Sequence, residues 1–171
     1  MLLPGWQNSG PGHWQTLWEQ HHGDLRVEQH DWMRPLRGDW SARLEDVILS
    51  APGPVALAAH SLGCILVAAW AAHSRHTARV RAALLVAVPD VERDDLRAVL
   101  PGWAPIARQR LPFRTRVVAS TDDPYGGLDT AGPLAAAWGA ELLSLGPRGH
   151  LNADSGLGHW PEGRALLTDM L

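Results

Sequence analysis

Short apolar runs alternate along the chain with longer segments of helical periodicity. Runs rich in Val, Leu and Ala end at turn residues, as is typical of strands buried on both faces. The expected strands cover residues 55–59, 80–88, 116–120 and 140–145, with weaker candidates at 1–3 and 25–29. Apolar spacing of 3.6 residues predicts helices over residues 14–21, 40–50, 65–73 and 128–138. Because parallel strands need crossover connections, this order predicts a mostly parallel sheet with helices on both faces.

Length and charge indicate a single domain and argue against one class of partner. The 171 residues contain no internal repeat or low-complexity linker, so we expect one α/β domain spanning residues 1–171. Lys and Arg number 15 against 18 Asp and Glu, which gives a formal charge of -3. The sequence also lacks a basic run of the kind that neutralises phosphates, which argues against a nucleic-acid partner.

The cysteine and histidine positions argue against disulfides, metals and cofactors. Cys64 is the single cysteine, so no intrachain disulfide or paired-cysteine zinc site can form, and we expect this residue to be a small buried one. The remaining histidines are not spaced with acidic or sulfur ligands in a pattern that would indicate a metal site. The start of the chain has no signal-peptide pattern, and no apolar stretch is long enough for a membrane span. These features predict a cytoplasmic protein without a membrane partner.

Polar residues of three chemically complementary types follow three of the expected strands. Ligands of parallel sheets bind beyond the carboxyl ends of the strands. Ser61, Asp123 and His150 each come just after a strand, in the chain order of α/β-hydrolases. Ser61 also has the small residues Ala59 and Gly63 two positions before and after it, as in a nucleophile elbow. A serine flanked by small residues in this way arises easily by chance. The stronger evidence is that Ser61, Asp123 and His150 all follow strands of the same expected sheet.

These residue types fit nucleophilic catalysis. A serine hydroxyl needs an imidazole to accept its proton, and the imidazole needs a carboxylate to fix its tautomer. Ser61, His150 and Asp123 are the candidates for these roles. Asp122 remains an alternative acid, and His159 an alternative base.

Two backbone N–H groups are candidates for an oxyanion hole. The N–H of Leu62 would begin the helix after the elbow and point to the place where negative charge develops. The loop after the first strand would supply the second donor at Trp6, because the preceding Gly5 lets that N–H turn inward. We expect Trp6 and Trp160 to border the substrate cleft.

Four segments carry a family resemblance: LPGWQNSGPGHWQTLWE, AHSLGC, STDDPYGG and GHLNADSGLGHWPEG. Together they resemble the small serine hydrolase family of α/β-hydrolases that includes retinoblastoma-binding protein 9 and its bacterial relatives. The resemblance implies a lidless α/β-hydrolase fold with Ser61 as nucleophile, Asp123 as acid and His150 as base. The short first strand suggests either a trimmed start or a weakly anchored edge of the site, and Gly126-Gly127 predicts a looser loop after the acid.

The sequence therefore predicts a cofactor-independent serine hydrolase of carboxylesterase type, which cleaves small ester or amide substrates through an acyl-enzyme. The alternative is a weak or inactive hydrolase fold that binds a protein or a small ligand. Residues 88–115 must carry a crossover and leave too little chain for a lid. We expect a shallow cleft, for which Trp103, Pro105 and Ile106 could form one apolar wall.

Overall fold

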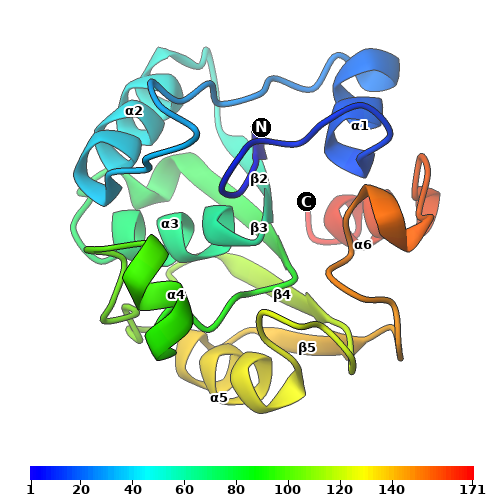
Figure 1. The fold of residues 1–171 in the computed structure, drawn as a ribbon. Helices are drawn as coiled ribbons and strands as arrows, with labels where there is room; N and C mark the ends of the chain where they lie inside the picture. Colours follow the sequence, from blue (N-terminus) through cyan, green and yellow to red (C-terminus); the bar gives the residue numbers. More distant parts are fainter.

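The computed structural model describes residues 1–171 and is built around one sheet of five parallel strands (Figure 1). The strands pair in sequence order: β1 (Leu2–Leu3), β2 (Val55–His60), β3 (Val80–Val86), β4 (Arg114–Ala119) and β5 (Glu141–Ser144). The four longer predicted strands are confirmed, with ends that differ by one or two residues. Their carboxyl ends therefore lie along one edge of the sheet.

Six α-helices connect or follow the strands. They are α1 (Trp14–His22), α2 (Arg37–Ser50), α3 (Leu62–Ala71), α4 (Asp94–Val99), α5 (Leu128–Trp138) and α6 (Pro161–Thr168). Short 3-10 turns occur at Thr77–Arg79 and Ala153–Ser155. The four predicted helices are confirmed, although α2 and α3 begin three residues earlier than the periodicity indicated. The helices α4 and α6 were not predicted.

Alternate residues of the strands β1 to β4 belong to two separate apolar cores. On β2, Leu57 and Ala59 pack with residues of α2, α3 and α5, whereas Ala58 packs with Trp14 and Trp18 of α1 and with residues of α6. This alternation follows from the two-residue period of a strand, which sends successive side chains to opposite faces. Figure 1 shows α1 and α6 on one side of the sheet and α2, α3 and α5 on the other. The predicted α/β-hydrolase architecture is confirmed.

The weak strand predicted at residues 25–29 is wrong. Only Arg26 bridges to the sheet, beside Leu2 of β1. The N–H of Leu2 donates to the Leu25 carbonyl at 2.8 Å, and the N–H of Val27 donates to the Leu2 carbonyl at 2.9 Å. Because β1 has only two residues, it offers no further partners for a longer ladder.

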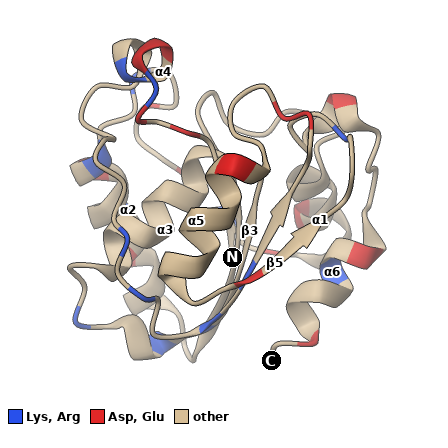
Figure 2. Cartoon of the chain, turned by 90° about the horizontal axis from the view of Figure 1, so that it is seen from below, with Lys and Arg blue, Asp and Glu red and all other residues tan.

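Most charged residues lie on helices and loops (Figure 2), and a few lie on the strands β3, β4 and β5. On and beside α4, acidic and basic positions alternate, and the Arg93 guanidinium pairs with the Asp95 carboxylate at 2.6 Å. None of the six helices combines the length and the apolar character that crossing a bilayer requires.

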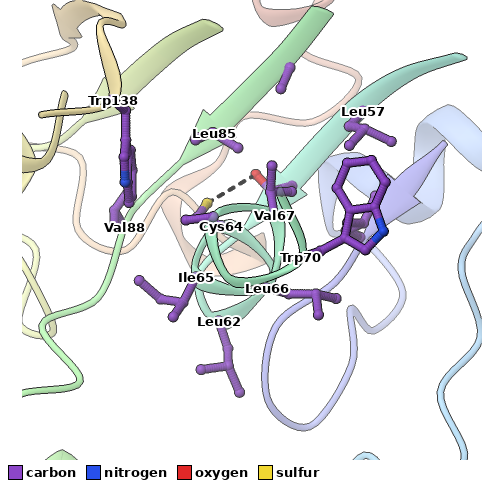
Figure 3. Close-up of a cluster of buried hydrophobic side chains, with 14 of the residues drawn as sticks. Leu57, Leu62, Cys64, Ile65, Leu66, Val67, Trp70, Leu85, Val88 and Trp138 are labelled. Carbon is purple, nitrogen blue, oxygen red and sulfur yellow. Dashed lines mark hydrogen bonds between the residues drawn. The ribbon is translucent and has the colours of Figure 1, made fainter. Parts of the chain in front are cut away.

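The helix α3 lies at the centre of the larger core (Figure 3). It is apolar on all sides, as a fully enclosed helix must be. Cys64 is completely buried there, and its thiol donates to the Val86 carbonyl at 3.3 Å. Burial raises the pKa of the thiol, so the sulfur stays protonated. The prediction of a small buried residue at Cys64 is confirmed.

Candidate active site

Ser61 occupies a strained turn between β2 and α3. Its backbone has φ 53° and ψ -124°, a conformation that residues with a side chain rarely adopt. Two hydrogen bonds hold the turn: the Ser61 N–H donates to the Val86 carbonyl at 2.9 Å, and the Cys64 N–H donates to the Ser61 carbonyl at 2.8 Å. The turn therefore sets the hydroxyl beyond the carboxyl edge of the sheet.

Two glycines allow the chain to pass close to this turn. A Cβ on Gly63 would overlap the Leu3 carbonyl oxygen, and a Cβ on Gly5 would lie 2.8 Å from the Ser61 Cβ. No L side chain fits at such distances without movement of backbone. The loop after β1 consequently packs directly onto the serine turn.

A continuous chain of hydrogen bonds joins the three predicted site residues. The Ser61 hydroxyl lies 2.9 Å from His150 Nε2, and His150 Nδ1 lies 2.9 Å from both carboxylate oxygens of Asp123. The Asp123 side chain is fully buried and that of His150 is 11% exposed. In the tautomer that satisfies this chain, Nδ1–H donates to the carboxylate and Nε2 accepts from the hydroxyl.

Asp122 and Asp123 make different contacts. One oxygen of Asp122 accepts from the Ser120 hydroxyl and from the Gly149 N–H, each at 2.7 Å. Both bonds lower the pKa of this exposed carboxyl, and the bond from the Ser120 hydroxyl has the larger effect. Asp122 thus ties the loop after β4 to the loop that carries His150, while Asp123 faces the imidazole.

The loop after Asp123 is held tightly, so the expected looseness at Gly126-Gly127 is wrong. A Cβ on Gly126 would overlap the Val88 carbonyl oxygen, which shows how closely two loops approach there. The Asp90 N–H donates to the Tyr125 carbonyl at 2.8 Å, and the Tyr125 N–H donates to Asp123 Oδ1 at 2.9 Å.

The two candidate oxyanion donors lie close to Ser61. Leu62 is the first residue of α3, where an N–H has no acceptor within the helix. The backbone N–H of Trp6 forms no hydrogen bond to another backbone group, whereas its indole N–H donates to the Met33 carbonyl at 3.0 Å. A Cβ on Gly5 would lie 3.1 Å from the Leu62 nitrogen, so the residue before Trp6 touches the start of α3.

Comparison with known proteins identifies the family. Residues 1–169 match a family model described as serine hydrolase. The chain belongs to this serine hydrolase family. The match confirms the resemblance noted in the sequence. No curated protein matches the chain.

Solved structures share the fold of this serine hydrolase. A YdeN-like hydrolase from Pectobacterium atrosepticum is 26% identical, with 99% of this chain and 88% of that chain covered and a TM-score of 0.85. The ydeN gene product of Bacillus subtilis is 20% identical, with coverage of 99% and 96% and a TM-score of 0.78. The carboxylesterase CesB from Bacillus subtilis is 14% identical, with coverage of 98% and 81% and a TM-score of 0.65.

A cavity of about 300 Å³ opens beside Ser61 in the serine hydrolase. Its polar part includes Ser61, His150 and the loop after β1, and its lining contains no Lys, Arg, Asp or Glu. Its apolar lining consists of Trp6, Leu62, Pro89, Leu96, Leu100 and Tyr125. Trp6 lines this cavity.

The apolar wall comes from α4 and the residue after it, and not from the segment that the sequence suggested. Leu96 and Leu100 line the cavity. Trp103 is instead fully buried in the larger core, and its indole N–H donates to the Pro35 carbonyl at 2.9 Å. Pro105 and Ile106 line a separate surface hollow, so the expected role of residues 103–106 is wrong.

Trp160 does not border the cleft, so that prediction is also wrong. The residue is 4% exposed, and its ring packs 5.3 Å from the ring of Trp14, in the core between α1 and α6. A large apolar ring gains more from burial there than at a wet rim. His159, the alternative base, packs its ring 4.2 Å from that of His21 and is not part of the cavity lining.

Two further histidines lie next to His150 and were not selected from the sequence. The His60 ring centroid is 4.6 Å from that of His13 and 4.8 Å from that of His150, and His60 Nε2–H donates to the His150 carbonyl at 2.8 Å. Burial holds the pKa of His60 well below its usual value. Burial, then the charges of Arg26 and His150, lower the pKa of His13 to about 3. Both rings are therefore neutral near pH 7. His60 is the last residue of β2, directly before Ser61, and His13 is the N-cap of α1. The position of His60 beside the serine could have drawn attention to it.

Proposed function

We propose that this serine hydrolase cleaves a small, uncharged ester or amide through an acyl-enzyme on Ser61. The observation that carries the proposal is the chain of 2.9 Å contacts from the Ser61 hydroxyl through His150 to Asp123. The strained backbone of Ser61 supports it, because strain of this kind persists where surrounding structure enforces an unusual presentation.

In the first half of the reaction, Ser61 Oγ bonds to the substrate carbonyl carbon and its proton passes to His150 Nε2. The buried Asp123 carboxylate stabilises the imidazolium and keeps Nδ1 protonated. The carbonyl oxygen becomes an oxyanion, which accepts from the Leu62 and Trp6 N–H groups. When the intermediate collapses, the bond to the leaving group breaks and His150 returns its proton to that group.

Water completes the cycle by the same route. A water molecule transfers a proton to His150 as its oxygen bonds to the acyl carbon. The bond to Ser61 Oγ then breaks, the serine recovers its proton, and the acid leaves.

The cavity supports a small neutral substrate. A volume of about 300 Å³ is at the lower end of the range of small-molecule sites. The lining has no fixed charge to pair with an ionic group, whereas Leu96 and Leu100 offer apolar contact to a short acyl chain. We accordingly assign the chain a carboxylesterase type of activity.

The proposal is tested by fluorophosphonate labelling of the folded protein, with the modified residue located by mass spectrometry. We expect one adduct, on Ser61, together with hydrolysis of p-nitrophenyl butyrate. Ser61→Ala should lose both, while Ser50→Ala, at an exposed serine of α2, should keep both. Labelling that persists in Ser61→Ala would exclude Ser61 as the nucleophile, and an unlabelled wild type would favour the alternative of a binding module.

A further inference from the structure

Arg26 is a buried cation that none of the proposed catalytic steps uses. Its side chain is 6% exposed. Its backbone lies at the edge of the sheet, where both neighbouring residues hydrogen bond to Leu2 of β1. The start of the guanidinium side chain is therefore fixed relative to the strands and to the serine turn.

The guanidinium contacts the loop after β1 and the first turns of α1. Nη1 donates to Asn8 Oδ1 at 2.6 Å and to the Ser9 carbonyl at 3.1 Å. Nη2 donates to the Thr16 hydroxyl at 2.8 Å, and this hydroxyl donates to the same Ser9 carbonyl at 2.9 Å. The Glu19 carboxylate, 2.8 Å from Nη2, balances the charge.

The loop that Arg26 contacts is strained. Gln7 and Asn8 have φ values of 67° and 65°, so two consecutive residues with side chains occupy the left-handed region. Such backbone persists only when surrounding contacts hold it. Within the loop, the Asn8 N–H donates to the Gly5 carbonyl at 3.1 Å and the Ser9 N–H donates to Asn8 Oδ1 at 2.8 Å. Other segments add three bonds: the Gln7 N–H donates to the Trp32 carbonyl, the Trp6 indole N–H donates to the Met33 carbonyl, and the Ser9 hydroxyl donates to Gln15 Oε1. Arg26 alone reaches both Asn8 and the Ser9 carbonyl with charge-assisted bonds.

We propose that Arg26 is a positioning residue, whose guanidinium holds residues 5–9 in this strained conformation and so keeps the Trp6 N–H directed at the substrate oxyanion. The inference rests on the proposed function, in which Trp6 is an oxyanion donor. Arginine suits this role because its planar fork reaches Asn8, Ser9 and Thr16 at once with charge-assisted bonds.

The first test compares Arg26→Met with Arg164→Met. Methionine keeps an apolar stem of similar length in each case. Arg164 also pairs with a carboxylate, that of Asp24, and lies over the Trp18 ring, but it does not contact residues 5–9. At a temperature where circular dichroism shows both variants folded, Arg26→Met should lose about 10- to 100-fold in kcat with KM within about twofold. Arg164→Met should keep kcat within about twofold.

A transition-state analogue distinguishes positioning from a general loss of active protein. Ser61 Oγ adds to the carbonyl carbon of an alkyl trifluoromethyl ketone, its proton passes to His150, and the ketone oxygen becomes an oxyanion. We expect the inhibition constant to rise in Arg26→Met by the factor that kcat/KM falls. A smaller active fraction would lower the apparent kcat and leave the inhibition constant unchanged. An unchanged inhibition constant, or a kcat within twofold of wild type, would overturn the proposal.

Thr16 provides a second route if Arg26→Met does not fold. Thr16→Val removes the hydroxyl that links Arg26 to Ser9 and keeps the shape, whereas Thr16→Ser keeps the hydroxyl. The inhibition constant should rise several-fold in Thr16→Val and return toward wild type in Thr16→Ser. Equal constants in the two variants would overturn the proposal. Activity that survives in Ser61→Ala would instead refute the proposed function itself.

Discussion

Two buried neutral histidines should make the fold sensitive to acid. His13 is 4% exposed and His60 is 5% exposed. Burial, followed by the charges of Arg26 and His150, lowers the pKa of His13 from 6.5 to about 3, and burial also holds the pKa of His60 well below 6.5. At pH values between about 3 and 6.5, the unfolded chain therefore binds more protons than the folded chain. The free energy of unfolding therefore falls as the pH decreases from about 6.5 toward about 3.

The size of the effect follows from the pKa of His13. At pH 5 the medium is about 1.5 units below the unfolded value, and one unit corresponds to about 1.4 kcal/mol. His13 alone should therefore cost about 2 kcal/mol at pH 5 relative to pH 7. The buried His60 adds to this loss in the same direction. The contribution of His13 alone is already a substantial part of the ~5–15 kcal/mol that stabilises a typical domain.

Urea unfolding at pH 7 and pH 5 measures this effect in the wild type, in His13→Asn and in His30→Asn. Asparagine keeps an oxygen that can accept the Gln15 N–H at the start of α1, but it does not titrate. We expect the loss of stability between the two pH values to shrink by about 2 kcal/mol in His13→Asn. It should be unchanged in His30→Asn, because His30 is exposed. A loss in His13→Asn as large as in the wild type would refute the reasoning.

Three further predictions concern the site and its surroundings. Asp123→Asn should lower kcat on p-nitrophenyl butyrate by roughly 10³- to 10⁴-fold because it favours the wrong tautomer of the imidazole. Asp122→Asn should cost far less, since its amide oxygen can still accept the Gly149 N–H; the opposite ranking in steady-state kinetics would transfer the acid role. Gly63→Ala should lower Tm strongly, because its Cβ would overlap a backbone oxygen, whereas Gly53→Ala has open space and should not; equal Tm values would contradict the close approach. Acetyl to butyryl p-nitrophenyl esters should show higher kcat/KM than decanoyl esters, because the cavity of about 300 Å³ cannot enclose a long chain; a steady rise with chain length would reveal a deeper pocket.

The strongest signals in the sequence came from the buried central strands, although the largely exposed β5 was also predicted. The strands β2 and β3 stand out because parallel strands covered on both faces are continuous apolar runs. The helix α4 buries only Leu96 and has polar residues around it, so its periodicity is too weak to read. Residues 25–29 have the apolar alternation of a strand, but pairing depends on the length of the neighbour, and β1 is too short to extend the ladder.

The convergence of Ser61, Asp123 and His150 could be predicted because each follows a strand of one parallel sheet. The choice between Asp122 and Asp123 could not be made from strand ends, since both follow β4, and only the local turn decides which carboxylate faces the imidazole. Trp160 lies away from its expected position for another reason. Its position in a loop suggested a rim, but the free energy of burying an indole ring draws it into the core.

The short first strand does not produce the weakly anchored edge that the sequence suggested. The strand β1 has two residues, yet the Ala58 N–H donates to the Met1 carbonyl at 2.9 Å on one side and residues 25 and 27 bond to Leu2 on the other. These bonds fix the backbone before Pro4 but do not reach Trp6. Beyond that point the Arg26 guanidinium supplies contacts that a longer ladder would otherwise provide, through partners 10 to 18 positions away in the sequence. Spacing and periodicity carry no signal for contacts of this kind. Support for residues 5–9, the loop that carries Trp6, should therefore depend on side chains more than on the length of β1.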